Sequence, residues 1–352
     1  MMAGKSGRRM NGRSARLKKM RRKRIRKTIA LLVFFVLAVG AGVGSLYVLQ
    51  GGKLSSPILT YCAADEFDSS ISAKTSLRAE GFAKDLVVVT EDVLLDGVNL
   101  EENQKGLLFD ISNEKVLFSK GAYERVYPAS ITKIMTAILA LKYGNMDETV
   151  TITQENVTLE SGSQVCGFAA GDKLTMGQLV RCLLVYSGND AAAAIACHIG
   201  GTEEDFVSMM NSYAAQLGCT GTHFSNPHGL QDENHYTTPY DIYLMLREAL
   251  NYSLFTEITQ MSSYTVEYTN ADGATVSTTL EATDHYLTGE ANAPKDVKIL
   301  GGKTGTTDSA GNCLALLSQN AYGQPFVSIV MGASSKDLLY EQMNALLSNI
   351  NE

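Results

Sequence analysis

Three short segments carry side chains that together could cleave an amide bond through a covalent serine intermediate. They are Ser130-Ile131-Thr132-Lys133, Ser187-Gly188-Asn189 and Lys303-Thr304-Gly305. A serine hydroxyl is a weak nucleophile at neutral pH and needs a base to remove its proton. Each segment alone is a weak signal, because a plain turn or a solvated helix start explains it equally well. Their combination, in this order along the chain, indicates one active site.

The first segment pairs a nucleophile with a base. Ser130 and Lys133 are three residues apart, so on a helix their side chains share a face. Lysine is normally protonated, with a pKa of about 10.4. It acts as a base only where burial or a second cation lowers that pKa, and Lys303 can supply the cation. We predict that Ser130 is the catalytic nucleophile and Lys133 its base.

The second segment lies between two apolar stretches, where a turn is expected. A hydroxyl and an amide in such a turn can point out of a helical lobe into a cleft. We predict that Ser187 is catalytic and relays a proton to the leaving amine. Asn189 is predicted to hold an amide of the substrate.

The third segment provides a cation, hydroxyls and a glycine on an expected strand. Lys303, Thr304 and Thr306 suit a carboxylate, which accepts charge-assisted hydrogen bonds. Gly305 lets a substrate backbone approach closely. We predict that these four residues bind substrate, and that the backbone N–H groups of Ser130 and Thr306 stabilise an oxyanion.

The N-terminal part of the chain differs sharply from the rest. Residues 1–27 contain 13 Lys and Arg and no Asp or Glu, and residues 28–49 contain no charged residue. About 20 apolar residues span a bilayer as a helix, and flanking basic residues stay in the cytoplasm. We predict a basic cytoplasmic tail, a transmembrane signal anchor over 28–49 and a linker over 50–85. A cleavable signal peptide is the alternative and would release the domain; a lipoprotein at Cys62 and nucleic-acid binding are disfavoured.

The remaining residues, 86–352, predict an α/β fold. Two apolar runs around residues 112–115 predict a hairpin. Capping signals predict helices, so that residues about 145–255 form a largely helical lobe. Further strands are expected at 264–268, 297–300, 313–317 and 326–331, before a final helix at 336–350. This order predicts an antiparallel sheet sandwiched by helices, with an inserted helical lobe and a cleft beside it.

The cysteines and histidines do not indicate a metal site. The chain has six Cys and five His, but it lacks a Cys-x-x-Cys pair. The spacings of His223, His228 and His235 match no helical His-x-x-x-His zinc motif. We predict no metal and no cofactor, and interpret these histidines as loop and capping residues. The cysteines are expected to be mostly free, buried thiols with at most one disulfide.

From Gly106 onward the chain resembles the serine-type D-alanyl-D-alanine carboxypeptidases, which are low-molecular-mass penicillin-binding proteins of the β-lactamase/transpeptidase-like superfamily. Residues 127–137 resemble their nucleophile segment, and residues 224–230 resemble a loop typical of them. The resemblance implies that the enzyme removes the terminal D-alanine of peptidoglycan stem peptides through an acyl-enzyme on Ser130. It also implies inhibition by β-lactams and a location at the bacterial cell membrane, with the catalytic domain outside.

One departure and several alternatives accompany this resemblance. Thr306 stands where many members have His, which bears on the rate or the choice of donor. A D,D-endopeptidase acting on cross-links uses the same residues and stays open. A class A β-lactamase is disfavoured because no Asp or Glu lies between Asp205 and Asp232 and because Gly188 replaces the usual Asp. A vestigial wall-binding or β-lactam-sensing domain is disfavoured because all three motifs are intact.

Overall fold

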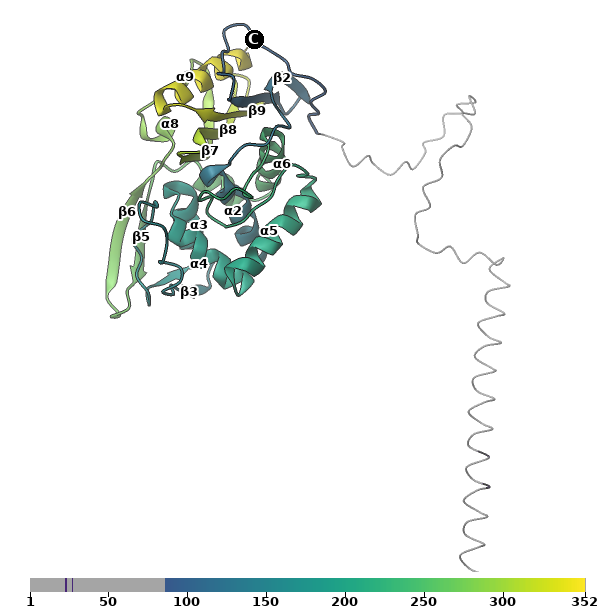
Figure 1. Ribbon diagram of the computed structural model, residues 1–352. Helices are drawn as coiled ribbons and strands as arrows, with labels where there is room; N and C mark the ends of the chain where they lie inside the picture. The colour runs from purple at the N-terminus through teal and green to yellow at the C-terminus, as the bar shows by residue number, and fades with distance from the viewer. Residues whose placement is uncertain (1–22, 24–26, 28–85, 352) are drawn as a thin grey trace, which may run out of the picture. The chain divides into compact units, whose positions relative to one another are not determined.

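The computed structural model describes residues 23, 27 and 86–351 (Figure 1). The predicted tail, transmembrane anchor and linker, at 1–27, 28–49 and 50–85, lie outside the described residues except for Lys23 and Lys27. No helix among the described residues is long and apolar enough to cross a membrane. The described residues from 86 onward belong to one compact unit.

The main sheet has five strands in the order β2-β1-β9-β8-β7, and every neighbouring pair is antiparallel. The predicted hairpin around residues 112–115 is confirmed and joins the first two strands. The strand bounds are β1 (Lys105–Asp110), β2 (Lys115–Lys120), β7 (Lys298–Thr307), β8 (Gly311–Gln319) and β9 (Pro325–Ala333).

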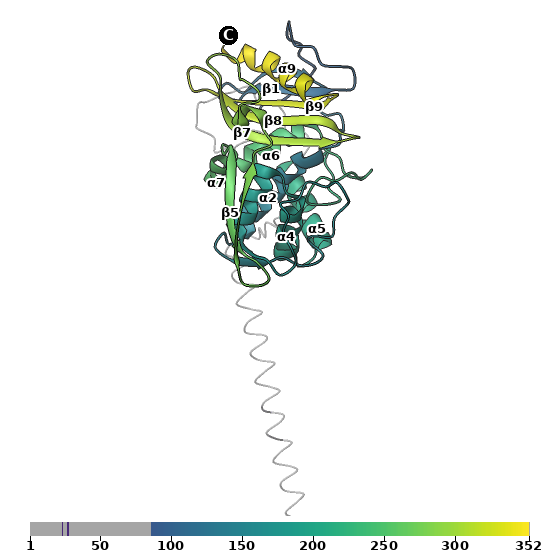
Figure 2. The same cartoon turned by 90° about the vertical axis from the view of Figure 1, so that its left-hand side faces the viewer.

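Both faces of this sheet are buried. Successive side chains of a strand point to opposite faces, so Leu107 and Phe109 pack in the core shared with the helical lobe, while Leu108 packs in the core under the last helix. That last helix, α9 (Lys336–Leu347), lies on one face, and α6 (Pro239–Ala249) lies on the other (Figure 2). The central strands therefore read as nearly continuous apolar runs.

The helical lobe forms where capping signals predict it. Thr175 makes a complete capping box with Gln178, and the hydroxyls of Thr202 and Thr238 accept hydrogen bonds from the first helical turns that follow. These contacts satisfy backbone N–H groups that a helix leaves unpaired. The lobe contains α2 (Lys133–Tyr143), α3 (Met176–Arg181), a π-helical turn (Cys182–Tyr186), α4 (Asn189–Gly200), α5 (Glu203–Leu217), α6 and α7 (Ser253–Ile258).

A second sheet was not predicted. Its strands follow the order β3-β4-β5-β6, with β3 (Thr149–Thr151), β4 (Lys173–Thr175), β5 (Ser263–Thr269) and β6 (Thr275–Glu281). β3 and β4 lie in the region predicted to be largely helical, but three residues are too few to give a periodicity. β6 is rich in Thr and mostly solvent-accessible, so it lacks the apolar alternation that identified β5. The α/β class with antiparallel sheets is confirmed.

Candidate active site

The nucleophile segment and the third motif lie against each other. Ser130 belongs to a short 3₁₀ turn, Ala129–Thr132, that leads directly into α2. β7 passes beside this turn, and a Cβ atom placed on Gly305 would lie 3.0 Å from the Ser130 backbone nitrogen and 3.0 Å from the Pro128 oxygen. Glycine at 305 therefore allows the strand to approach the nucleophile closely.

The turn that presents Ser130 is strained and is supported from two sides. Ala129 has a φ of 47°, a left-handed conformation that is costly for a residue with a Cβ. The hydroxyl of Thr132 donates to the Ala129 carbonyl at 2.8 Å. A Cβ on Gly229 would lie 1.9 Å from the same carbonyl oxygen, so the 224–230 loop packs tightly behind the turn. Such packing can hold Ser130 in a fixed direction.

Lys133 connects three parts of the site. Its side chain is completely buried. Its Nζ lies 2.8 Å from Ser130 Oγ, 2.6 Å from Asn189 Oδ1 and 2.6 Å from the His228 carbonyl oxygen. The last two partners can only accept hydrogen bonds, whereas a hydroxyl can also donate. A neutral amine can therefore give its two hydrogens to those oxygens and direct its lone pair at the Ser130 hydroxyl.

The surroundings of Lys133 favour this neutral form. Burial lowers its pKa well below the ordinary value, and the positive charge of Lys303 lowers the pKa further. Burial disfavours the charged form of an amine, and a nearby like charge adds to this effect. Lys133 thus has the geometry and the protonation behaviour that a general base requires.

The second motif places a second hydroxyl, that of Ser187, in the same cleft as Ser130. Ser187 has a φ of 68° and follows the π-helical turn. Lys303 Nζ donates to its Oγ at 2.8 Å. Lys303 is also buried, and burial lowers its pKa to about 7, against the attraction of Asp284, which raises it. Each of the two buried lysines is therefore hydrogen bonded to a serine of the site.

A carboxylate fixes the start of α4 and with it the second motif. Asp190 accepts hydrogen bonds from the N–H groups of Cys166 and Gly167 at 2.9 and 3.0 Å. The Asn189 N–H donates to the Gln164 carbonyl at 2.8 Å. These contacts join the 164–167 loop to the helix start, where a negative charge is also favoured by the helix dipole.

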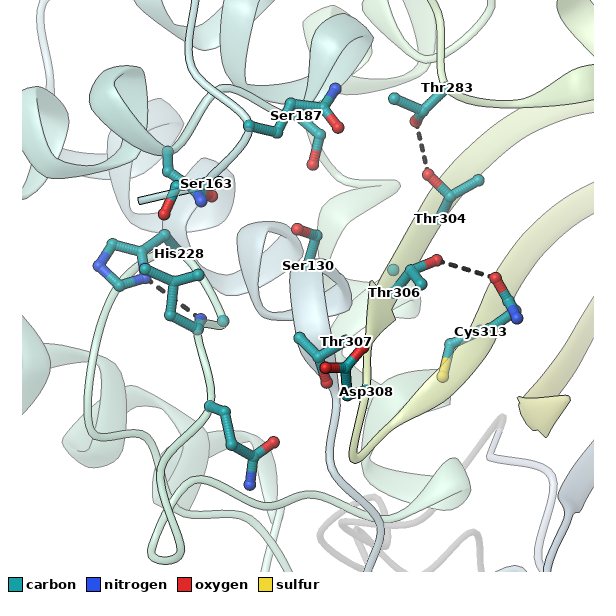
Figure 3. Close-up of a pocket in the computed structure, with 18 of the residues that line it drawn as sticks. Ser130, Ser163, Ser187, His228, Thr283, Thr304, Thr306, Thr307, Asp308 and Cys313 are labelled. Carbon is teal, nitrogen blue, oxygen red and sulfur yellow. Dashed lines mark hydrogen bonds between the residues drawn. The ribbon is translucent and has the colours of Figure 1, made fainter. Parts of the chain in front are cut away.

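The motifs surround one cleft of about 620 Å³ (Figure 3). Six of the eight predicted site residues line it: Ser130, Ser187, Asn189, Thr304, Gly305 and Thr306. The other two, Lys133 and Lys303, are buried and reach its serines by hydrogen bonds. The structure therefore brings all eight predicted residues together.

Two residues of the site were missed or interpreted too simply. His228 was interpreted as a loop residue, yet its carbonyl binds Lys133. His235 was interpreted in the same way, yet it is buried and its Nε2 lies 2.7 Å from the Thr132 hydroxyl. The sequence signal for His228 is the family-like segment 224–230, whereas His235 lies beyond that segment. In the part of the chain that the structure describes, no group of three or more His, Cys, Asp or Glu is arranged to hold a metal ion.

No disulfide forms among the cysteines that the structure describes. The five cysteines of residues 86–351 are free thiols, and three of them, Cys182, Cys219 and Cys313, are buried. This agrees with the expectation of mostly free thiols. Cys62 lies outside the described residues.

Comparisons with known proteins agree on one family. A family model described as D-alanyl-D-alanine carboxypeptidase matches residues 100–335. The D-alanyl-D-alanine carboxypeptidase DacF of Bacillus subtilis is 33% identical over 251 residues, which cover 70% of this chain and 61% of the relative. DacA of Escherichia coli is 30% identical over 288 residues, covering 75% of this chain and 66% of the relative.

A solved structure extends the similarity to three dimensions. The Streptomyces K15 DD-transpeptidase matches with a TM-score of 0.63 and 26% identity, over 69% of this chain and 96% of that structure. The chain thus spans almost the whole of this structural neighbour, but less than two thirds of the length of the first curated relatives.

Proposed function

We propose that this chain, which belongs to the D-alanyl-D-alanine carboxypeptidase family, is a serine peptidase that removes the terminal D-alanine from peptidoglycan stem peptides. The observation that carries the proposal is the contact between Lys133 Nζ and Ser130 Oγ at 2.8 Å, made by a fully buried lysine. This pair supplies an activated nucleophile at the floor of a cleft that is large enough for a peptide end.

The cleft residues have the chemistry to bind a peptide that ends in a carboxylate. Thr304 and Thr306 line the cleft with hydroxyls, and the buried Lys303, next to Thr304 in sequence, can contribute positive charge. Charge-assisted hydrogen bonds to a carboxylate are among the stronger polar contacts in proteins. Asn189 also lines the cleft, where it can hold a substrate amide.

The proposed reaction begins when Ser130 Oγ attacks the carbonyl carbon of the penultimate residue. Lys133 takes the hydroxyl proton as the new C–O bond forms. The C–N bond then breaks, and the leaving D-alanine amine receives a proton through the Ser187 hydroxyl. Water hydrolyses the ester on Ser130 and restores the free enzyme. β-Lactams acylate the same serine in this proposal, which makes them inhibitors.

The acceptor in the second half of the reaction distinguishes the related activities. The structural neighbour is named a DD-transpeptidase, in which an amine rather than water accepts the acyl group. A D,D-endopeptidase would use water but would start from a cross-linked peptide. All three begin with the same acyl-enzyme, so only the products separate them. We propose water as the acceptor because both curated relatives are named carboxypeptidases.

Intact mass spectrometry of the full chain after addition of penicillin tests the proposed chemistry. We expect an adduct of one penicillin that persists for minutes, together with release of D-alanine from a synthetic peptide ending in D-Ala-D-Ala. An adduct that disappears in seconds while penicillin is consumed would indicate a β-lactamase instead. A chain that forms no adduct and releases no D-alanine would contradict the proposal.

The proposed location is the bacterial cell membrane, with the catalytic domain outside. Support comes from the sequence alone: 22 uncharged residues at 28–49 follow a tail rich in Lys and Arg. Cell fractionation with protease added to intact spheroplasts tests it. A membrane-bound chain whose catalytic domain is digested from outside is expected, whereas recovery from the medium would indicate cleavage of the anchor.

A further inference from the structure

Asp284 is a buried carboxylate beside the proposed site. Its side chain is only 5% exposed, and it caps the N-terminus of the short helix α8 (His285–Thr288). Its Oδ1 accepts from the Tyr286 N–H at 3.0 Å and from the Tyr340 hydroxyl at 3.3 Å. Its Oδ2 accepts no hydrogen bond from any residue that the structure describes. A helix cap needs only one oxygen, so capping does not explain the buried second oxygen.

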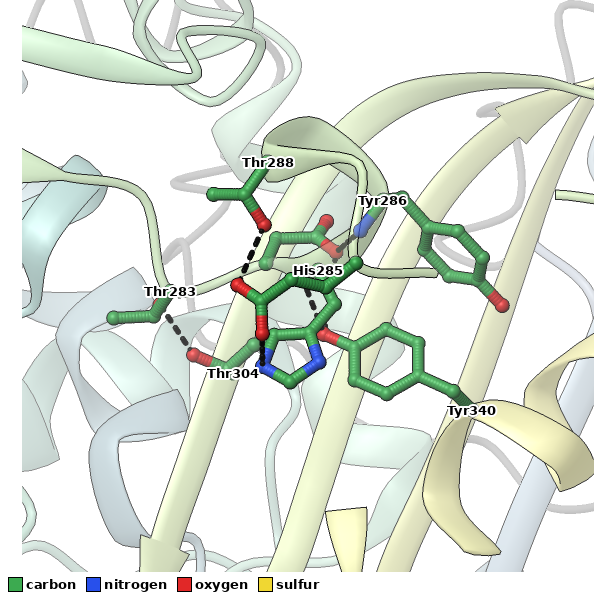
Figure 4. Close-up of polar contacts among 8 residues, drawn as sticks. Thr283, His285, Tyr286, Thr288, Thr304 and Tyr340 are labelled. Carbon is green, nitrogen blue, oxygen red and sulfur yellow. Dashed lines mark hydrogen bonds and ion pairs between the residues drawn. The ribbon is translucent and has the colours of Figure 1, made fainter. Parts of the chain in front are cut away.

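The carboxylate is held in a fixed position by two helices. The Tyr340 hydroxyl on α9 also accepts from the His285 N–H at 2.8 Å, and the two rings stack with centroids 4.8 Å apart (Figure 4). His285 in turn lies 3.5 Å from the carboxylate of Glu290. Asp284 thus cannot turn its free oxygen towards solvent without breaking these contacts.

Asp284 lies next to the part of β7 (Lys298–Thr307) that carries Lys303. The Thr283 hydroxyl lies 2.5 Å from the Thr304 hydroxyl, which ties the segment before α8 to β7 (Figure 4). A cavity of about 10 Å³ is shared by Asp284, Gly302 and Thr304, the last two being the residues on either side of Lys303. Among the described residues that line this cavity, Asp284 is the only ionisable one. Asp284 and Lys303 are both buried, so little solvent screens the attraction between their charges.

The charges around Asp284 and Lys303 show how this attraction can affect the protonation of Lys303. Lys303 is hydrogen bonded to Ser187, is repelled by Lys133, and is attracted by Asp284, whose charge raises its pKa against the effect of burial. Asp284 has its pKa raised by burial, while the N–H of Tyr286, the hydroxyl of Tyr340 and the charges of His285 and Lys303 lower it. Two buried lysines that repel each other do not both stay protonated.

We propose that Asp284 is a positioning residue that assigns the proton to Lys303, so that Lys303 remains the cation of the site while Lys133 stays neutral as the base. The inference rests on the proposed function and deepens it. Removal of the carboxylate leaves the catalytic groups in place but removes the attraction that keeps Lys303 charged. Lys303 then loses its proton at a lower pH than in the unmodified chain. The site therefore lacks its cation at pH values at which the unmodified chain still has it.

The test is the pH dependence of acylation by a fluorescent penicillin, measured on the full chain and on Asp284→Asn. We expect the alkaline limb of the rate profile to move to lower pH by about one unit in the variant, because a nearby charge typically shifts a pKa by that amount or more. The variant Asp284→Ser keeps a side-chain oxygen that can cap α8 but removes the charge. It must give the same shift, so a folding defect in one of the two variants cannot produce the expected result. Glu290→Gln is the matched control, because it removes an exposed carboxylate from the same segment and leaves the profile in place.

The outcomes separate the inference from the proposed function. A rate that falls equally at every pH, with an unmoved alkaline limb in both Asp284 variants, would show that Asp284 only caps α8 and would overturn the inference. An equal shift in Glu290→Gln would also overturn it, because general surface charge would then explain the effect. If the unmodified chain is not acylated at any pH, the proposed function itself fails.

Discussion

Lys133 and Lys303 are two buried lysines that each hold a different serine of the same cleft. Lys133 Nζ lies 2.8 Å from Ser130 Oγ, and Lys303 Nζ lies 2.8 Å from Ser187 Oγ. Burial lowers the pKa of both, and the charge of Lys303 lowers that of Lys133 further. Each serine thus has its own buried lysine as hydrogen-bond partner, and the proposed mechanism gives the two serines different tasks.

Ser130→Ala and Ser187→Ala should therefore give different kinetic results. Ser130→Ala removes the atom that would carry the acyl group, so neither a penicillin adduct nor D-alanine release is expected. Ser187→Ala removes the proposed proton relay, and such a group typically contributes a factor of about 10² to 10⁴. We expect a slow but measurable release in that variant, followed by a coupled assay for D-alanine.

Thermal unfolding is the control for both serine variants. Each loses one hydroxyl in the cleft, so the melting temperature should stay within a few degrees of the unmodified chain. Release by Ser130→Ala at the unmodified rate would remove Ser130 from the mechanism. Equal, complete loss of adduct formation in both variants would contradict the separate tasks of the two serines.

Gly305→Ala should slow acylation although it adds only one methyl group. The new Cβ would lie 3.0 Å from the Ser130 nitrogen and 3.0 Å from the Pro128 oxygen, both of them backbone atoms. β7 must then move away from the nucleophile, and displacement of groups near the reacting atoms by about 1 Å can cost a factor of about 100.

The rate constant for acylation by a fluorescent penicillin measures this effect. Thr307→Ala, two positions along the same strand, is the matched control because it adds no atoms near Ser130, and it should acylate within a few-fold of the unmodified rate. Unchanged acylation in Gly305→Ala would mean that the approach of β7 to the nucleophile is unimportant.

The site could be predicted from sequence wherever a side chain provides the chemistry. Ser130 and Lys133 are three residues apart, which places them together in any helical turn, and the lysine of the third motif has an obvious charge. The His228 carbonyl could not be predicted, because every residue has a carbonyl and only the folded loop aims this one at Lys133. Asp284 was missed for a related reason, since its neighbours β7 and α9 come later in the chain.

The fold shows the same division. The strands β8 and β9 were predicted because burial on both faces requires apolar residues along most of each strand. The second sheet depends on pairing rather than on burial. β6 is polar and largely solvent-accessible, and its residues pair with β5 along seven positions. Backbone pairing of this kind leaves little trace in the residue types.

Lys303 should make the stability of the fold depend on alkaline pH. Its pKa is about 7 in the folded chain and about 10.4 when unfolded. Between these values the unfolded chain binds more protons, so the free energy of unfolding rises with pH. The variant Lys303→Met lacks the titrating amine. Between about pH 7.5 and pH 9.5, the unfolding free energy of the unmodified chain should therefore rise by about 2 kcal/mol more than that of the variant. Urea unfolding of both chains at the two pH values measures these free energies. An equal change in the two chains would contradict the lowered pKa of Lys303.

His235 should make the fold sensitive to acid. Its Nδ1 accepts from the Ser225 N–H at 3.0 Å, so its Nε2 carries the hydrogen and donates to the Thr132 hydroxyl. Burial lowers its pKa to about 4, whereas an unfolded histidine titrates near about 6.5. Below that value the unfolded chain binds more protons, so stability is lost as the pH falls towards 4.

His235→Gln tests this acid sensitivity, because a glutamine amide offers one donor and one acceptor and does not titrate. From about pH 7 to pH 5 the unmodified chain should lose about 2 kcal/mol more unfolding free energy than the variant. His223→Gln is the control, because that ring is exposed and bonds to the Asn234 carbonyl. This variant should lose as much unfolding free energy as the unmodified chain over the same pH range. If His235→Gln is as acid-sensitive as His223→Gln, the buried ring behind the nucleophile turn is not the group that titrates.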